Sequence, residues 1–235
     1  MSLSTPDDYF ELGRVLNERG QWGEAADAWR AAMVAGDPDV AAIAALNLGT
    51  LLHRLEDQDG ADEAWQIALD HGVEEVSSRA GIALASLRQE SEDFPGAARA
   101  LRAVLSLEDR PHIATAALNL GVVEQRLGEV DEAEESFRLA IMAAENSEPV
   151  RSMAMHNLGV LATDEERFSD AEEAFIEVIE WGDADLAPKA KLDLGTMYAR
   201  SGRPDEARST WKEVVDSGHP AVAPTASDNL AVLDS

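Results

Sequence analysis

The stretch ALNLGTLL at residues 45–52, followed by Ala61, Trp65 and Ala68, sets a pattern that recurs along the whole chain. When the sequence is aligned with itself, one small residue returns at steps of 36, 36, 36, 38, 36 and 36 residues. The members of this glycine column are Gly13, Gly49, Ala85, Gly121, Gly159, Gly195 and Ala231. A period of this length predicts stacked pairs of helices.

Other residues repeat at fixed distances from the glycine column. A leucine precedes every member, at positions 12, 48, 84, 120, 158, 194 and 230. The residues 12, 16 and 19 positions after each of the first six members are Ala25, Trp29 and Ala32; Ala61, Trp65 and Ala68; Ala97, Leu101 and Val104; Ala133, Phe137 and Ala140; Ala171, Phe175 and Val178; and Ala207, Trp211 and Val214. The pattern strongly resembles the tetratricopeptide repeat, which has a Leu-Gly pair on its first helix and small and aromatic residues on its second.

The resemblance implies an all-α fold. We expect an α-solenoid of six helix pairs in a right-handed superhelix, closed by a capping helix at residues 224–235. The expected repeats are residues 6–41, 42–77, 78–113, 114–151, 152–187 and 188–223. Because the repeats of a solenoid contact only their neighbours, we predict a single domain over residues 6–235. The sequence departs from the usual repeat in its period, which is 36 residues instead of 34, and in the alanine of the third repeat.

Turn and capping residues fit these helix pairs. Thr5 followed by Pro6 predicts the start of the first helix, and Gly20 predicts its end. The second helices are expected to start ten residues after the glycine column, where Ser169 and Glu172 have the spacing of a capping box. The link at residues 145–149 has two extra residues to absorb, either by a local change in stacking or in a surface loop.

The composition excludes several kinds of site. The absence of cysteine excludes disulfides, thiolate catalysis and cysteine-based metal sites. The five histidines, at positions 53, 71, 112, 156 and 219, lack metal-ligand spacing, and the sequence has neither a phosphate-binding glycine-rich loop nor a nucleophile elbow. We therefore expect no cofactor, no metal and no enzymatic activity. No apolar run approaches the roughly 18 residues of a membrane span, and no signal segment is visible, so we expect a cytoplasmic protein that does not contact membranes.

The chain is strongly acidic, with 46 acidic and 19 basic residues and a formal net charge of −27. Binding to nucleic acid depends on clusters of Lys and Arg, so this balance argues against a nucleic-acid partner. Residues 129–180 hold fifteen Asp and Glu residues against three Arg residues, a net of −12. Two interpretations stay open: the charge keeps an extended surface soluble, or it helps to recruit a basic partner.

The first helices carry two stripes of side chains. In the second repeat Leu48, Gly49 and Leu52 recur at helical spacing and are expected to pack against the partner helix, whereas a second stripe points elsewhere. In the tetratricopeptide repeat family this second stripe lines the concave groove that holds ligands. The candidate groove residues are Ile43, Leu46, Asn47, Ile82, Leu118, Asn119, Val122, His156, Asn157, Val160 and Leu192.

The asparagines of this set, Asn47, Asn119 and Asn157, stand two residues before the glycine column. An amide both donates and accepts hydrogen bonds, so a ladder of amides can satisfy the backbone of an extended peptide. The alternative is that Asn-Leu-Gly is simply frequent in such repeats, and that His156 makes an ordinary polar contact. We expect Leu118 and Asn119 to lie outside the packed stripe, so that replacing either leaves the fold intact. The family's clamp for acidic C-termini needs Lys and Arg in these columns, which here hold other residues.

Two functions follow from the sequence. The first is a scaffold or adaptor that binds a peptide or helix of a partner protein in the concave groove. The second is a homo-oligomeric assembly module that associates through the ends of the solenoid or an exposed apolar face.

Overall fold

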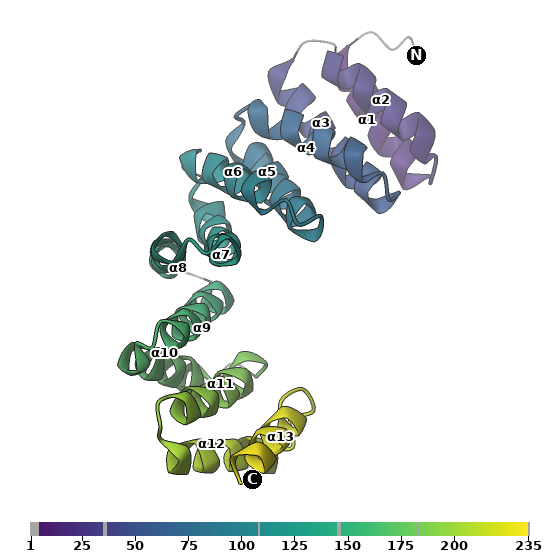
Figure 1. Cartoon of the computed structure of the whole chain (residues 1–235). Helices are drawn as coiled ribbons and strands as arrows, with labels where there is room; N and C mark the ends of the chain where they lie inside the picture. Colours follow the sequence, from purple (N-terminus) through teal and green to yellow (C-terminus); the bar gives the residue numbers. More distant parts are fainter. Residues whose placement is uncertain (1–4, 35–36, 108, 145–146, 183, 235) are drawn as a thin grey trace. The chain divides into compact units, whose positions relative to one another are not determined.

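The computed structural model describes residues 5–34, 37–107, 109–144, 147–182 and 184–234. Within these residues the chain forms thirteen α-helices and no strand, which confirms the all-α prediction (Figure 1). The helices are α1 (Pro6–Glu18), α2 (Trp22–Val34), α3 (Pro38–Arg54), α4 (Gln58–Asp70), α5 (Glu74–Glu90), α6 (Phe94–Ser106), α7 (Arg110–Leu127), α8 (Val130–Ala143), α9 (Glu148–Asp164), α10 (Phe168–Trp181), α11 (Leu186–Arg200), α12 (Pro204–Asp216) and α13 (Ala223–Leu233). The link predicted to absorb two extra residues lies partly outside the described residues, which omit 145–146.

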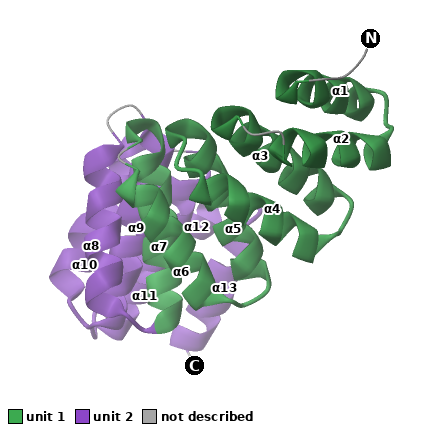
Figure 2. Ribbon diagram, turned by 90° about the horizontal axis from the view of Figure 1, so that it is seen from above, with its two compact units in different colours: residues 1–127 green, residues 128–235 purple. Residues whose placement is uncertain are grey.

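The helices fall into two compact units, residues 1–127 and residues 128–235 (Figure 2). In the first unit α1 packs on α2, α3 on α4 and α5 on α6, and α7 packs on α6. In the second unit α9 packs on α10 and α11 on α12, while α8 packs on α9 and α13 on α12. The antiparallel pairs of a helical-repeat solenoid are therefore confirmed. A single domain over residues 6–235 and a right-handed superhelix stay predictions.

Local sequence signals explain where the helices begin. Thr5 and Asp8 form a capping box at the start of α1, with Pro6 as the first helical residue, as predicted. Asp57 and Asp93 cap α4 and α6, since each accepts a hydrogen bond from a backbone N–H in the first turn. The predicted capping box of Ser169 with Glu172 is wrong, because α10 begins at Phe168 and Ser169 already lies inside it.

The turn between the helices of a pair explains this shift. Gly20 has a φ of 75°, in the left-handed region that a glycine adopts without strain. At the equivalent position other repeats have glutamates in the same region, with φ values of 63°, 60° and 57° for Glu56, Glu92 and Glu166. This one residue reverses the chain and the N-cap residue follows it directly, so the second helix starts one residue earlier than predicted.

The glycine column lets the two helices of a pair approach closely. A Cβ atom added to Gly13, Gly49, Gly159 or Gly195 would lie 2.5–2.7 Å from the aromatic ring that stands sixteen residues later. Those rings, from Trp29, Trp65, Phe175 and Trp211, are buried. In the third repeat Ala85 and Leu101 occupy the same two columns, and both are fully buried in the first core cluster. A larger residue on the first helix is therefore matched by a smaller one on the second.

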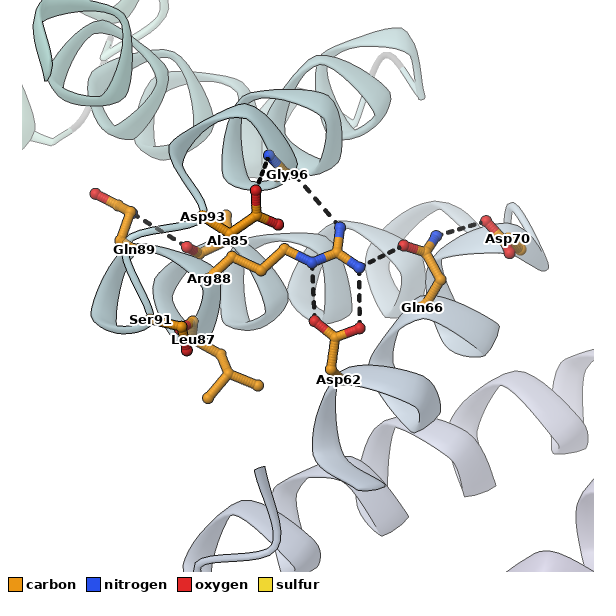
Figure 3. A network of polar contacts seen from close by, with 10 residues as sticks. All are labelled: Asp62, Gln66, Asp70, Ala85, Leu87, Arg88, Gln89, Ser91, Asp93 and Gly96. Carbon is orange, nitrogen blue, oxygen red and sulfur yellow. Dashed lines mark hydrogen bonds and ion pairs between the residues drawn. The ribbon is translucent and has the colours of Figure 1, made fainter. Parts of the chain in front are cut away.

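Ion pairs join three of the second helices, α4, α8 and α10, to the repeat that follows. In the first unit the Arg88 guanidinium donates from Nε to Asp62 Oδ1 at 2.8 Å and from a terminal nitrogen to Asp62 Oδ2 at 3.0 Å (Figure 3). Arg88 also donates to Gln66 Oε1 at 3.1 Å and to the carbonyl of Gly96 at 3.4 Å. In the second unit Arg167 pairs with Glu134 at 2.7 Å, and Arg203 pairs with Glu172 at 2.6 Å. We call these three contacts the inter-repeat clamps.

An ion pair of the same kind joins α12 to the end of α13, but here the basic residue is on the second helix and the acidic residue follows the next helix. Arg208 stands thirteen residues after its glycine-column member, as Asp62, Glu134 and Glu172 do. Its guanidinium pairs with Asp234, just after α13, at 2.9 Å. An ion pair at this position therefore tolerates either order of charge.

The clamp at Glu172 makes part of the stability of the second unit depend on pH. A hydrogen bond from Arg203 is the main cause that lowers the pKa of Glu172 below its ordinary 4.5, and Tyr198 donates a second one at 2.7 Å. Burial, with this hydrogen bond next, raises the pKa of the Tyr198 hydroxyl to about 12, so Tyr198 stays a donor at neutral pH. The charged form of Glu172 is thus favoured in the folded chain.

We expect Glu172→Gln to lower the midpoint of urea unfolding at pH 7, and the difference from wild type to shrink as the pH falls below 4.5. A carboxyl with a depressed folded pKa contributes stability that is present above its unfolded pKa and is lost as the pH falls through the folded pKa. Circular dichroism at several pH values measures this. Glu173→Gln is the control, because Glu173 is exposed and has no ion pair in the described residues. A Glu172→Gln difference that stays constant from pH 7 to about 3 would contradict the prediction.

Candidate functional site

The candidate groove residues all lie on the first helices of their repeats. In the first unit α3 contacts both α1 and α5, and α5 contacts α7; in the second unit α9 contacts α11. The α3, α5 and α7 candidates are Ile43, Leu46, Asn47, Ile82, Leu118, Asn119 and Val122, and the α9 and α11 candidates are His156, Asn157, Val160 and Leu192. The structure thus places them on two sets of neighbouring helices. We call these two sets of candidates the first-helix faces of the first and second unit.

Burial separates the apolar candidates into two groups. Five of them are half-buried and keep part of their side chain accessible: Ile43, Ile82, Val122, Val160 and Leu192. Leu46 and Leu118, by contrast, are only 5% and 6% exposed. Leu118 is therefore a buried residue, and the expectation that it lies outside the packed stripe is wrong. Burial at this position is set by tertiary packing, which the spacing within one helix does not reveal.

The amides of the three candidate asparagines have no hydrogen-bond partner in the described part of the chain. Asn47, Asn119 and Asn157 are half-buried, and their side chains make no hydrogen bond to another group in the described part of the chain. Asp193 stands in the same column of the sixth repeat, but its carboxylate lies 2.8 Å from His156 Nε2. The amides of Asn47, Asn119 and Asn157 therefore keep their full hydrogen-bonding capacity for a ligand.

His156 is a structural contact between two repeats. Its side chain is 4% exposed, its Nε2 lies beside Asp193 of α11, and its ring centroid is 5.7 Å from that of Phe175. The histidine thus joins α9 to the next first helix and packs on its own second helix. This geometry agrees with the interpretation of His156 as an ordinary polar contact. The imidazole is not free to bind a ligand.

Sequence reasoning missed the polar contacts at the end of the first helices. Arg54 donates a hydrogen bond to Asn17 Oδ1 at 2.9 Å, and Arg200 pairs with Asp164 at 2.7 Å, so each contact ties one first helix to the next. A signal was available, because charge alternates in sign five residues after the glycine column. The members of this alternating column are Glu18, Arg54, Glu90, Arg126, Asp164 and Arg200. Opposite charges on neighbouring helices favour this stacking order.

The described residues were searched for metal-binding clusters and for membrane-spanning helices. Among them, no group of three or more His, Asp or Glu side chains could hold a metal ion. None of the helices in the described ranges is both long and apolar enough to cross a bilayer.

Comparison with known proteins agrees with the repeat pattern. The sequence model of a family described as "Tetratricopeptide repeat" matches residues 10–72, 82–149 and 154–221. Among solved structures, the MamA protein is similar with a TM-score of 0.64 and 20% identity, covering 74% of this chain and 90% of that one. A tetratricopeptide repeat protein from Parabacteroides merdae has a TM-score of 0.61 and 16% identity, covering 98% of this chain and 99% of that one.

A third similar structure is that of Pseudomonas aeruginosa pilF, with a TM-score of 0.62, 18% identity and 92% of each chain covered. At such identities the structural matches establish a shared fold and no shared ligand. A comparison with curated protein sequences gave no match.

Proposed function

Because the chain belongs to the tetratricopeptide repeat family, whose repeats generally form scaffolds for protein–protein interaction, we propose that its first-helix faces bind a peptide or helix of a partner protein. Members of the family are typically not catalytic. The proposal assigns the binding role to the asparagine amides and to the accessible aliphatic side chains beside them.

The observation that carries the proposal is the free, half-buried state of Asn47, Asn119 and Asn157. A polar side chain that is partly withdrawn from water and lacks a protein partner gains most when a ligand supplies its hydrogen bonds. An extended peptide presents N–H and C=O groups at regular intervals and needs apolar cover for alternate side chains. Val122 follows Asn119 by three residues on α7, so it lies on the same side of the helix.

The experiment titrates a partner peptide against variants of the first unit. Affinity capture from native lysate identifies partners, and overlapping peptides of each partner then give a fluorescent probe for anisotropy. Asn47→Ala with Asn119→Ala is expected to weaken binding about thirtyfold, since each lost hydrogen bond costs about 1 kcal/mol at a partly buried site. Val122→Glu is expected to weaken binding more than tenfold, because a charge replaces an apolar contact.

Matched controls separate binding from folding. Val122→Thr keeps the shape of the side chain and is expected to lose much less affinity than Val122→Glu. Leu118 is not used, since its burial makes any charged replacement a test of folding. If correctly folded variants, judged by circular dichroism, all bind the probe like wild type, the first-helix face of the first unit is not the binding site.

Self-association is a second candidate function, favoured by apolar side chains that remain exposed. Val34, Met142 and Val232 are 86%, 77% and 75% exposed. Scattered exposed apolar residues are common, so the decisive measurement is the molecular mass itself. A mass from light scattering that rises with protein concentration, without any partner, would support an assembly module, and a constant monomer mass would exclude it.

A further inference from the structure

A cleft of about 210 Å³ lies between α8, α9 and α10 of the second unit. Its apolar lining comes from Met155, Leu158 and Ala162 of α9 and from Ala174 of α10. Leu158 is half-buried, whereas the leucines of the same column in the second, third, fourth and sixth repeats are buried: Leu48, Leu84, Leu120 and Leu194. Leu158 is therefore partly accessible and lines the cleft.

Some of the charged side chains that line the cleft form ion pairs with each other, and others have no partner in the described residues. Arg138 and Arg167 both form ion pairs with Glu134, and Arg167 also pairs with Asp170 at 3.0 Å. Both cations are thus committed to carboxylates of the protein. The other two carboxylates of the lining have no ion pair or hydrogen bond within the described residues, and they are Glu173 and Glu177.

These two glutamates lie one helical turn apart on α10 and line the same cleft. With four carboxylates and two guanidinium groups, the lining carries a net charge of −2. It also lies within residues 129–180, whose fifteen acidic and three basic residues make the surroundings negative. The charge that complements Glu173 and Glu177 is positive, and the same cleft has the apolar side chains of Met155, Leu158, Ala162 and Ala174 in its lining.

We propose that this cleft is a docking site for a basic segment of a partner protein. One apolar side chain of the segment enters the cleft beside Leu158, and flanking Lys or Arg side chains pair with Glu173 and Glu177. The volume fits this occupant, since it is below the roughly 300–1,000 Å³ typical of small-molecule sites. Outside the lining, Met142 stands one helical turn beyond Arg138 on α8 and is 77% exposed.

The equivalent cleft of the first unit has a different charge. It lies between α2, α3 and α4, has a volume of about 190 Å³ and is lined by apolar residues that include Leu48 and Leu52. Its charged lining consists of Arg30 and Glu63, and Ile67 stands in the column that Glu177 occupies. The cleft of the first unit is therefore neutral overall. The site takes a basic segment in the second unit only, and it does not rest on the proposed role of the first-helix faces.

The test uses the full chain and a fluorescein-labelled amphipathic helical peptide of Leu and Lys residues as the probe. Glu173→Lys with Glu177→Lys is expected to weaken binding of this peptide at least tenfold in anisotropy titrations. The matched control is Glu132→Lys with Glu165→Lys, which changes the net charge equally at two exposed glutamates outside the cleft lining and is expected to change binding less than threefold.

Two further arms test the sign of the charge and the apolar contact. Arg138→Ala removes a cation from the cleft while Arg167 stays paired with Glu134, so it is expected to tighten binding. A peptide with Glu in place of Lys is expected not to bind, and one with Ser in place of Leu is expected to bind at least tenfold more weakly. Raising the salt concentration from about 0.05 to 0.5 M is expected to weaken binding of the Leu-Lys peptide, because salt screens exposed charge.

Three results would overturn the proposal. Equal weakening by the two charge-reversed double variants would mean that the peptide responds to net charge alone. Unchanged binding by Glu173→Lys with Glu177→Lys, in a variant with wild-type helical content, would place the peptide elsewhere. Loss of peptide binding by Asn47→Ala with Asn119→Ala would place the peptide on the first-helix face of the first unit. Unchanged binding by this double variant keeps the two sites distinct.

Discussion

Gly49→Ala is expected to lower the free energy of unfolding by about 2 kcal/mol, because the new methyl group overpacks a closed contact between α3 and α4. A Cβ atom at this position would lie 2.5 Å from Cδ1 of Trp65, whose side chain is buried. The ring cannot withdraw without opening the core of the first unit. Urea unfolding followed by circular dichroism measures the change.

The third repeat provides the compensating change. It has Ala85 and Leu101 in the columns of Gly49 and Trp65, so Gly49→Ala with Trp65→Leu rebuilds a pair that this chain already packs. Trp65→Leu alone is expected to cost about 2 kcal/mol through the cavity that it leaves. The double variant should lose at least about 1 kcal/mol less than the two single changes together, because each substitution relieves the fault of the other.

Gly23→Ala is the control for helix propensity. Nothing lies within 4 Å of a Cβ atom at Gly23 of α2, so alanine there is expected to be neutral or to stabilise by up to about 1 kcal/mol. If Gly49→Ala with Trp65→Leu loses as much stability as the two single variants added together, the glycine column is not matched to the ring beside it.

Arg88→Met is expected to lower the free energy of unfolding of the chain by about 2 kcal/mol, through loss of the clamp between α4 and α5. Methionine keeps much of the apolar stem but removes the hydrogen bonds to Asp62, Gln66 and Gly96. The Arg88 side chain is 16% exposed, so water replaces those bonds poorly, whereas Asp62 at 37% remains partly solvated. Arg88→Lys should recover only part of the loss, since an ammonium group cannot make the bidentate contact.

Arg79→Met on the same helix is the matched control. Arg79 is 57% exposed and reaches Glu75 only at 4.0 Å, so its removal is expected to change the free energy of unfolding by less than about 0.5 kcal/mol. Equal effects of the Arg88 and Arg79 variants on the urea midpoint would mean that the clamp adds nothing beyond an exposed ion pair.

The sequence by itself determined the helices, their pairing and the family. This was possible because the contacts within a helix pair are local in sequence. A glycine-column residue and its ring, such as Gly49 and Trp65, are sixteen residues apart and meet within one repeat. The columns also placed every candidate groove residue on a first helix. Those features depend on the spacing along one chain segment, which the sequence displays directly.

Only the tertiary structure decided which candidates remain accessible. Leu118 and His156 occupy the same column as the half-buried Ile82 and Leu192, yet both are buried. The clamp of Arg88 with Asp62 and the unpaired state of Glu173 were likewise invisible in the sequence. The physical reason is that accessibility and pairing are set by side chains of neighbouring repeats, whose separation and angle depend on how whole helices pack and not on the residue type in any one column.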